Sequence, residues 1–370
     1  MKEVCDKKSC TGCHACYNIC PRGCITMEQD EFGFFSPNIE QKLCINCGKC
    51  KRICPAVNNV ECHKPIGVYA AINKNSKDYL EATSGGIATL LSREIVSKGG
   101  VVYGAACCEN LKIKHIRVDN MKDIDKLKGS KYVQSLIEDS YKNILDDLNN
   151  AKNVLFVGAP CQVAGLYNFL GRKYEKLLTC DIVCHGTPPL KLLKEHLNHV
   201  KIYNGTNILF RTEKGFYLKV LDGNNSIYQK KNFFDIYYIG FLKGLYYNEV
   251  CYDCKYANCE RVGDITLGDF WGFNNAHEFV VKHDNGLSMV MINTEKGKKV
   301  FNKLESKMYV QKRTIEEAVA GNKQLRQPSL KHKNYEKFKR EYKVYGFEKA
   351  AKKALWKERI AYSIIDKISK

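Results

Sequence analysis

Apolar residues recur along residues 65–328 in two alternating patterns, one typical of buried strands and one typical of helices that cover a sheet. Continuous apolar runs predict strands at 67–72, 101–107 and 154–160. Residues 83–100 repeat apolar side chains at helical spacing and end in Gly99-Gly100, which predicts a helix. We therefore expect an α+β or mixed α/β body with a large mixed sheet covered by helices.

A different pattern governs residues 329–370, where apolar side chains share one face of a predicted long helix. These positions are Phe347, Ala351, Ala354, Leu355, Tyr362, Ile365 and Ile368. Residues 331–370 also hold 13 Lys and Arg against 5 Asp and Glu. Two interpretations are open: a solvated face on a packed helix, or a docking surface that attracts an acidic carrier such as ferredoxin. We expect neither DNA nor RNA as a partner, because no recognised nucleic-acid-binding fold accompanies the charge.

Residues 1–62 follow neither pattern, because cysteine dominates them. Two runs, CTGCHACYNICP and CINCGKCKRICP, share the spacing C-x2-C-x2-C-x3-C-P. Each cysteine of the second run lies 34 residues after its counterpart, so the segment is internally duplicated. Between the runs, ITMEQDEFGFFSPNI predicts a short hairpin.

This doubled spacing suits a bacterial-type ferredoxin domain with two [4Fe-4S] clusters. Three closely spaced thiolates can bind three corners of one cluster, and the fourth cysteine, which precedes proline, binds the other cluster. The predicted ligands are Cys10, Cys13, Cys16 and Cys54 for the first cluster and Cys44, Cys47, Cys50 and Cys20 for the second. Structural zinc fits less well, because zinc sites usually separate their CxxC units by a longer gap. We interpret the remaining thiols of this segment as ordinary ones; they are Cys5, Cys24 and Cys62.

Composition narrows the class of protein. The chain has 370 residues, 19 cysteines, 44% hydrophobic residues and a formal charge of +19, which is typical of a soluble globular protein rich in thiols. The first residues lack the apolar segment of a secretory signal, and we expect no transmembrane segment. We therefore expect a cytoplasmic protein whose reduced thiols bind metal or do redox work. Bound clusters would make it less basic than its composition indicates.

Three later segments place cysteines near the ends of predicted strands. They are GAPCQVAGL with Cys161, CDIVCHGTPP with Cys180 and Cys184, and CYDCKYANCERVGDITLGDFWG with Cys251 and Cys254. Ligands gather where the strands of parallel sheets end, so one interpretation is a third cluster. Its candidate ligands are Cys161, Cys184, Cys251 and Cys254. Zinc and inert buried thiols are the alternatives.

The residues just before the predicted helix offer a second candidate site. The sequence Thr83-Ser84-Gly85-Gly86 lies directly before the helix, where free backbone N–H groups and the helix dipole favour a phosphate. A plain N-cap at Ser84 is the alternative, and the local sequence favours it. No G-x-G-x-x-G follows a predicted strand, so a Rossmann dinucleotide site is not supported.

Taken together, these stretches resemble the family of coenzyme F420 hydrogenase/dehydrogenase beta subunits, here with a fused two-cluster ferredoxin domain. The matching stretches are TSGGIATLL, KGSKYVQS (128–135), LFVGAPCQVAGL, CDIVCHGTPP and CYDCKYANCERVGDITLGDFWG. They cover roughly residues 65–275. The resemblance implies an FAD in the body, an iron–sulfur cluster close to it, and a two-electron partner at the flavin. Some members of the family oxidise or reduce coenzyme F420, and one plant branch reduces a chlorophyll derivative.

The resemblance also assigns residues. It favours Cys161, Cys184, Cys251 and Cys254 as ligands of the third cluster and leaves Cys180 and Cys259 as extras. It reverses the preference for a plain N-cap, since the implied flavin contacts are Thr83, Ser84, Gly85, Gly86, Ser130, Lys131, Tyr132 and Gln134. The family signature GDITLGDFWG contains Asp264, Asp269 and Trp271. An acid there could orient backbone amides or relay a proton. Equally, it could be a turn residue whose side chain caps its own backbone.

The expected function follows from the chemistry of these groups. Clusters carry single electrons, and a flavin converts them into the two-electron chemistry of coenzyme F420 or another small-molecule cofactor. We expect an oxidoreductase that exchanges electrons with a ferredoxin-like carrier or a partner oxidoreductase. One alternative is a non-catalytic electron-transfer subunit, and another is a zinc-stabilised binding module. We predict domains at 1–62, 65–328 and 329–370, and the sequence assigns no catalytic residue.

Overall fold

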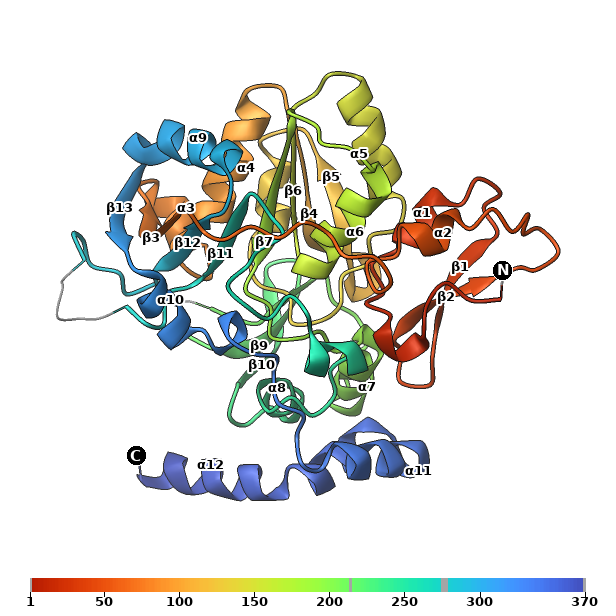
Figure 1. The fold of residues 1–370 in the computed structure, drawn as a ribbon. Helices are drawn as coiled ribbons and strands as arrows, with labels where there is room; N and C mark the ends of the chain where they lie inside the picture. Colours follow the sequence, from red (N-terminus) through yellow and green to blue (C-terminus); the bar gives the residue numbers. More distant parts are fainter. Residues whose placement is uncertain (1, 213–214, 274–278, 369–370) are drawn as a thin grey trace.

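The computed structural model describes residues 2–212, 215–273 and 279–368. Figure 1 shows a small N-terminal lobe on one side of a larger body and a pair of C-terminal helices along the edge of that body. A mixed sheet forms the centre of the body. The predicted fold class is therefore confirmed.

The N-terminal lobe repeats one local structure twice. Its elements are α1 (Ala15–Ile19), β1 (Ile25–Gln29), β2 (Phe35–Ile39) and α2 (Lys49–Arg52), after a 3₁₀ turn at Lys7–Ser9. Strands β1 and β2 pair antiparallel, which confirms the predicted hairpin. The residues before α1 and α2 are His14 and Gly48, which stand at equivalent positions of the repeat and both adopt left-handed backbone conformations, with φ of 60° and 73°. The duplication is thus present in the backbone as well as in the sequence.

The body is built on an eight-stranded sheet with the order β13-β3-β12-β11-β7-β6-β4-β5. Its strands are β3 (Gly67–Asn73), β4 (Val101–Cys108), β5 (Lys112–Val118), β6 (Val154–Gly158), β7 (Leu177–Ile182), β11 (Ile265–Asp269), β12 (Ser288–Ile292) and β13 (Met308–Arg313). The four central strands β4, β6, β7 and β11 run parallel, and the outer strands pair antiparallel. The three strands predicted from apolar runs correspond to β3, β4 and β6.

Helices cover both faces of this sheet. One face packs against α4 (Ile87–Ser97) and α9 (Glu295–Leu304), and the other packs against α5 (Ser140–Asn149) and α6 (Pro160–Leu170). Pro160 occupies the first turn of α6, where its missing N–H costs nothing. Cys161, expected near the end of a strand, therefore lies on the first turn of the helix that follows β6. The remaining body helices are α3 (Ser76–Leu80), α7 (Leu190–His199), α8 (Ile236–Leu242) and α10 (Ile315–Gly321).

A second layer lies below the sheet in Figure 1, around its own apolar core. It contains α7, α8 and a three-stranded sheet of β8 (Asn207–Leu209), β9 (Tyr217–Asp222) and β10 (Asn225–Lys231). The tail forms α11 (Tyr335–Ala354) and α12 (Trp356–Ile368), and Gly346, with φ of 72°, interrupts α11. The prediction of one long helix is therefore wrong.

The apolar face predicted for the tail is partly confirmed. The buried members are Phe347, Ala351, Ala354 and Leu355, and Tyr362 packs against them. The side chains of Ile365 and Ile368 lie outside the described residues. The start of α11 also binds the N-terminal lobe, because Lys343 pairs with Glu31 at 2.8 Å and the ring of Tyr342 lies 5.1 Å from that of Phe32.

A buried ionic network fastens α11 to the body. The ring of His196 on α7 lies 3.0 Å from the carboxylate of Asp235 and 2.9 Å from that of Glu348 on α11. Burial alone would lower the pKa of His196, but the hydrogen bonds and charges of the two acids outweigh it and raise that pKa to about 9. Burial alone would raise the pKa of Glu348, but the hydrogen bonds and charges of His196 and Lys352 lower it to about 2. His196 is therefore cationic at neutral pH.

This raised pKa predicts a pH-dependent contribution to stability. The contribution is complete below the ordinary histidine pKa of about 6.5 and is lost as the pH rises through about 9. Replacement of His196 by Gln should therefore lower the melting temperature strongly at pH 6.5, by about 3 kcal/mol in free energy of unfolding, and much less at pH 10. Thermal unfolding of both proteins across this range is the measurement.

His199 is the matched control, because it is half-exposed and lies 3.8 Å from the same Glu348. His199→Gln should change the melting temperature little at either pH. A His196→Gln deficit that is equally large at pH 6.5 and pH 10 would contradict a charged His196.

Candidate cofactor and cluster sites

A cavity of about 340 Å³ opens where the parallel strands end. It is lined by Gly104 of β4, which directly follows the residues that pair with β6, and by Gly158 of β6, Ile182 of β7 and Asp269 of β11. Its volume lies within the range of small-molecule sites. The sequence argument placed ligands at this edge of a parallel sheet, and the structure has its candidate cofactor cavity there.

Seven of the eight predicted flavin contacts line this cavity: Thr83, Ser84, Gly86, Ser130, Lys131, Tyr132 and Gln134. Two of them present buried polar atoms that have no hydrogen-bond partner in the described part of the chain, namely Ser84 Oγ and Gln134 Oε1. The N-cap of α4 is Gly86 with φ of 77°, and no side chain caps the helix. The interpretation of Ser84 as a plain N-cap is therefore wrong.

Two predicted contacts have structural roles instead. Gly85 does not line the cavity and packs on the sheet, where a Cβ would lie only 2.1 Å from the carbonyl oxygen of Ala71. Lys131 faces the cavity but donates its ammonium to the carbonyls of Leu127, Lys128 and Gly129. Burial lowers its pKa to about 8. Lys131 therefore folds the loop that carries Ser130 and Tyr132.

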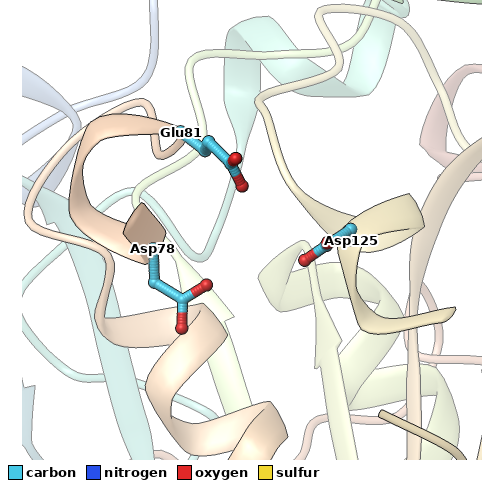
Figure 2. Close-up of side chains that lie close together, drawn as sticks. All are labelled: Asp78, Glu81 and Asp125. Carbon is cyan, nitrogen blue, oxygen red and sulfur yellow. The ribbon is translucent and has the colours of Figure 1, made fainter. Parts of the chain in front are cut away.

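A cluster of acids anchors the start of the same loop. Figure 2 shows the carboxylates of Asp78, Glu81 and Asp125 directed toward a common point. The ammonium of Lys128 lies 3.0, 2.5 and 2.8 Å from them, respectively. Arg93 also pairs with Asp78, at 2.6 Å. The cluster thus binds this chain's own cations and holds the loop before Ser130.

The four candidate ligands of a third cluster line a second, larger cavity of about 790 Å³. They are Cys161 on α6, Cys184 after β7, and Cys251 and Cys254 at the 3₁₀ turn Glu249–Asp253. Burial raises the pKa of Cys184 to about 11 and that of Cys251 to about 12. Burial also raises the pKa of Cys161, followed by the charges of the other three thiolates. The structure thus brings thiols from three distant segments together.

A buried ion pair holds two of these segments together. Arg261 donates to the carboxylate of Asp181 at 3.0 Å, and the two side chains are 2% and 0% exposed. The second oxygen of Asp181 accepts the backbone N–H groups of Val262 and Gly263. Arg261 also donates to the carbonyl of Tyr256. The strand that leads to Cys184 is therefore joined to the loop that follows Cys254.

The two extra cysteines point elsewhere. Cys180 is buried in the core between the sheet and α4 and α9, and Cys259 lies 3.1 Å from the carbonyl of Leu325. Neither lines the larger cavity. Of the signature acids, Asp264 accepts the backbone N–H of Thr179 at 2.9 Å, so it orients an amide of β7.

The eight N-terminal cysteines surround two small cavities. One is lined by Cys10, Cys13, Cys16 and Cys54, and the other by Cys20, Cys44, Cys47 and Cys50. This grouping exchanges the fourth cysteine between the two runs, as the spacing predicts. Cys5 and Cys24 line one cavity each, and Cys24 Sγ lies 3.3 Å from Cys20 Sγ. Their interpretation as ordinary thiols missed this proximity, because neither takes part in the repeat.

Thr11 connects the lobe to both cavities of the body. It lines the first small cavity, the larger thiol cavity and the cofactor cavity. Gln134 donates to its carbonyl at 3.0 Å. Close packing adds to this contact, since a Cβ on Gly165 of α6 would lie 3.0 Å from Cys13 Sγ. No sequence signal marks Thr11, which is one polar residue between two cysteines.

The rim of the cofactor cavity contains further residues that sequence reasoning missed. Arg211 pairs with Asp269 at 2.8 Å and donates to the carbonyl of Thr83. Its guanidinium lies 4.4 Å from the ring of Phe216 and 5.5 Å from that of Trp271. Asp269 and Trp271 line the cavity, and Trp271 is 53% exposed. The predicted acid of the signature is thus one half of an ion pair that joins three segments.

Comparisons with known proteins agree with the resemblance. Residues 151–318 match the family described as the C terminus of the coenzyme F420 hydrogenase/dehydrogenase beta subunit. Residues 9–58 match the 4Fe-4S dicluster domain. The predicted resemblance to this family, together with a 4Fe-4S dicluster domain, is therefore confirmed.

Two curated proteins are similar over most of this chain. The coenzyme F420-dependent sulfite reductase of Methanocaldococcus jannaschii is 27% identical over 363 residues, which are 90% of this chain and 50% of that protein. This chain therefore spans about half the length of that relative. A subunit of the F(420)H(2) dehydrogenase of Methanosarcina mazei is 21% identical over 327 residues, which are 84% of this chain and 86% of that protein.

Among solved structures, a chain of the F420-reducing [NiFe] hydrogenase complex from Methanosarcina barkeri is similar at 18% identity and a TM-score of 0.49, over 81% of this chain and 92% of that one. None of the helices in the described part of the chain has the length and apolar character needed to span a membrane.

The Asp181–Arg261 pair generates a testable prediction. Arg261→Leu leaves a buried carboxylate without its cation, which should lower the free energy of unfolding by about 3–5 kcal/mol. Urea unfolding measures this change. Arg172→Leu is the control, because Arg172 is exposed and should change stability by about 0.5 kcal/mol or less.

The double variant Asp181→Asn/Arg261→Leu removes both charges and should recover part of the loss. A single Arg261→Leu variant as stable as Arg172→Leu would show that the pair does not hold the two segments together.

Proposed function

We propose that this chain, which joins a 4Fe-4S dicluster domain to a region matching the coenzyme F420 hydrogenase/dehydrogenase beta subunits, is an iron–sulfur flavoprotein oxidoreductase. It passes electrons between [4Fe-4S] clusters and a two-electron substrate such as coenzyme F420 through FAD. One observation carries the proposal: the thiol cavity and the cofactor cavity share a wall. The shared residues are Thr11, Cys161, Cys184, His185, Gly186 and Thr187.

The residues of the cofactor cavity fit a flavin nucleotide. The orphaned Ser84 Oγ and Gln134 Oε1 offer polar contacts to a ligand in an otherwise largely apolar site. The N-terminus of the eleven-residue helix α4 opens on the cavity at Gly86 and can bind a phosphate through free N–H groups. These residues would hold the cofactor, while Lys131 and the acid cluster hold the loop that surrounds it.

The donor sets fit iron–sulfur clusters. Each of the three cavities is lined by its four predicted cysteine ligands, and four cysteines are the ligand set of a [4Fe-4S] cluster. The larger cavity is also bordered by Tyr256, which is 5% exposed and whose hydroxyl has no partner in the described chain. A phenol in this position can donate a hydrogen bond to a sulfur of the group held there.

The chain's own residues determine which cofactor sites lie next to each other and can exchange electrons. Bound FAD would exchange a hydride with a two-electron substrate and single electrons with the clusters. Pro55 and Ala56, directly after Cys54, line both the first small cavity and the larger thiol cavity. The first lobe site, the thiol cavity and the cofactor cavity therefore adjoin one another. The second lobe site adjoins the first, because Cys50 packs in one core with Cys16 and Cys54. At the far end, the exposed Trp271 offers a flat apolar surface for an aromatic substrate, and Arg211 fixes its neighbour Asp269.

A second function is supported by the relative from M. mazei, which is a subunit of a dehydrogenase. In this function the chain is a non-catalytic electron-transfer subunit that supplies electrons to a partner enzyme. The two functions differ in whether the isolated chain turns over a hydride donor. In both functions the redox partner of the chain is a ferredoxin-like carrier or a partner oxidoreductase.

Anaerobic reduction tests the proposed activity. We expect reduced coenzyme F420 to bleach the bound flavin and, with an artificial one-electron acceptor, to support steady turnover, whereas NADH and NADPH serve as comparison donors. Absorbance of the flavin and of the acceptor is the measurement. Bleaching without turnover by any of the three donors would favour the electron-transfer subunit, and a chain without flavin would refute the proposal.

Cysteine substitution tests the third ligand group. Cys254→Ser should lower bound iron by about one third, because one of three clusters loses a thiolate ligand. Cys259→Ser is the matched control, since Cys259 lies on the same loop but outside the cavity. Iron and zinc analysis of both variants is the measurement. Equal iron in the two variants would exclude Cys254 as a ligand, and zinc in place of iron would support the metal-stabilised binding module.

A further inference from the structure

The site of the second lobe cluster lies at the surface, unlike that of the first. Its cavity is lined by Cys47, which is exposed, and by Ile45, which is 60% exposed. Leu43, on the other side of the ligand Cys44, is 48% exposed. The four predicted ligands at the first lobe cavity are all buried, with exposures of 9% or less; they are Cys10, Cys13, Cys16 and Cys54.

The same surface is strongly basic. Residues 41–60 contain Lys42, Lys49, Lys51 and Arg52 and neither Asp nor Glu. All four side chains are exposed, and none forms an ion pair within the described residues. Arg22 adds a fifth exposed cation on the wall of the same cavity. The nearest acid in sequence is Glu40, whose carboxylate accepts the backbone N–H of Lys42.

The five cations outnumber the negative charges of Glu40 and of a bound cluster, so this surface has a net positive field around its exposed apolar side chains. Such a field speeds the encounter with a partner of opposite charge, and the apolar centre supplies contact once the partner has docked. The basic tail is a less suitable surface. Lys343 of α11 already pairs with Glu31 of the lobe, and Lys353 of α11 pairs with Glu341.

We propose that the surface formed by Arg22, Lys42, Leu43, Ile45, Cys47, Lys49, Lys51 and Arg52 is the docking site for an acidic one-electron carrier protein. This inference rests on the proposed function and adds the place and the charge of the partner. In one encounter the carrier is oxidised by one electron, and the group bound by Cys20, Cys44, Cys47 and Cys50 is reduced by one. The tail, which the sequence offered as a docking surface, has a structural role in this account.

Stopped-flow reduction of the intact, cluster-loaded chain tests the proposal, with a strongly acidic, chemically reduced 2[4Fe-4S] ferredoxin as the probe. The variant Lys42→Gln/Lys51→Gln/Arg52→Gln should slow the second-order reduction of the clusters about tenfold at low salt. The difference should shrink as salt screens the charges. The matched control, Lys349→Gln/Lys353→Gln/Lys357→Gln, removes three exposed charges from the tail and should reduce at the wild-type rate.

Two further measurements keep the outcome clear. Iron content and the electron paramagnetic resonance spectrum of each variant show whether the lobe clusters are intact. If the triple variant loses iron, the single variant Lys42→Gln repeats the test, because Lys42 lies outside the two cysteine runs. Reduction by a small cationic viologen should be equally fast in all variants.

If the tail variant is reduced slowly and the lobe variant at the wild-type rate, the tail is the docking surface and the proposal is wrong. If both variants are reduced at the wild-type rate, the proposal is also wrong. Failure of the proposed function gives a different result from failure of the docking proposal. In that case the clusters accept electrons from the carrier, but the flavin stays oxidised.

Discussion

The ion pair between Asp181 and Arg261 is the constraint on which the arrangement of the body depends. Both side chains are almost fully buried, and a buried charge is stable only when it is paired and hydrogen-bonded. Arg261 meets this condition through carbonyls of its own loop, and Asp181 meets it through Thr266 and two backbone amides. The pair thereby fixes the loop after Cys254 against the strand before Cys184, although about 70 residues separate these cysteines in sequence.

Once this loop is fixed, the remaining geometry follows from packing. Helix α6 starts at the end of β6 and brings Cys161 to the same cavity, while Gly165, one turn later, lets Cys13 of the lobe pack directly on the helix. The larger cavity consequently touches the lobe at Thr11 and the cofactor cavity at Cys161 and Cys184. Close succession of sites is what single-electron transfer to a two-electron site requires.

Much of this arrangement could be predicted from the sequence where the signal was local. Ligand spacing alone grouped the eight lobe cysteines, because the chain can reach the corners of a cluster in only a few ways. Apolar runs located β3, β4 and β6 because buried strands exclude polar residues. The apolar face of the tail was predicted correctly as far as Tyr362. The break at Gly346 was not predicted, since a glycine inside a helical pattern signals only a weak preference.

Features that depend on contacts between distant segments could not be predicted. The resemblance implies Lys131 as a flavin contact, yet the fold turns its ammonium onto three carbonyls of its own loop. Arg211 and Thr11 carry no motif, and they matter only because the small sheet and the lobe approach the cofactor cavity. The central claim is that three cysteine sets and one flavin site lie in succession. Anaerobic counting of iron, sulfide and flavin per chain tests it most directly: the account predicts about twelve irons, twelve sulfides and one FAD, and about eight irons without flavin would contradict it.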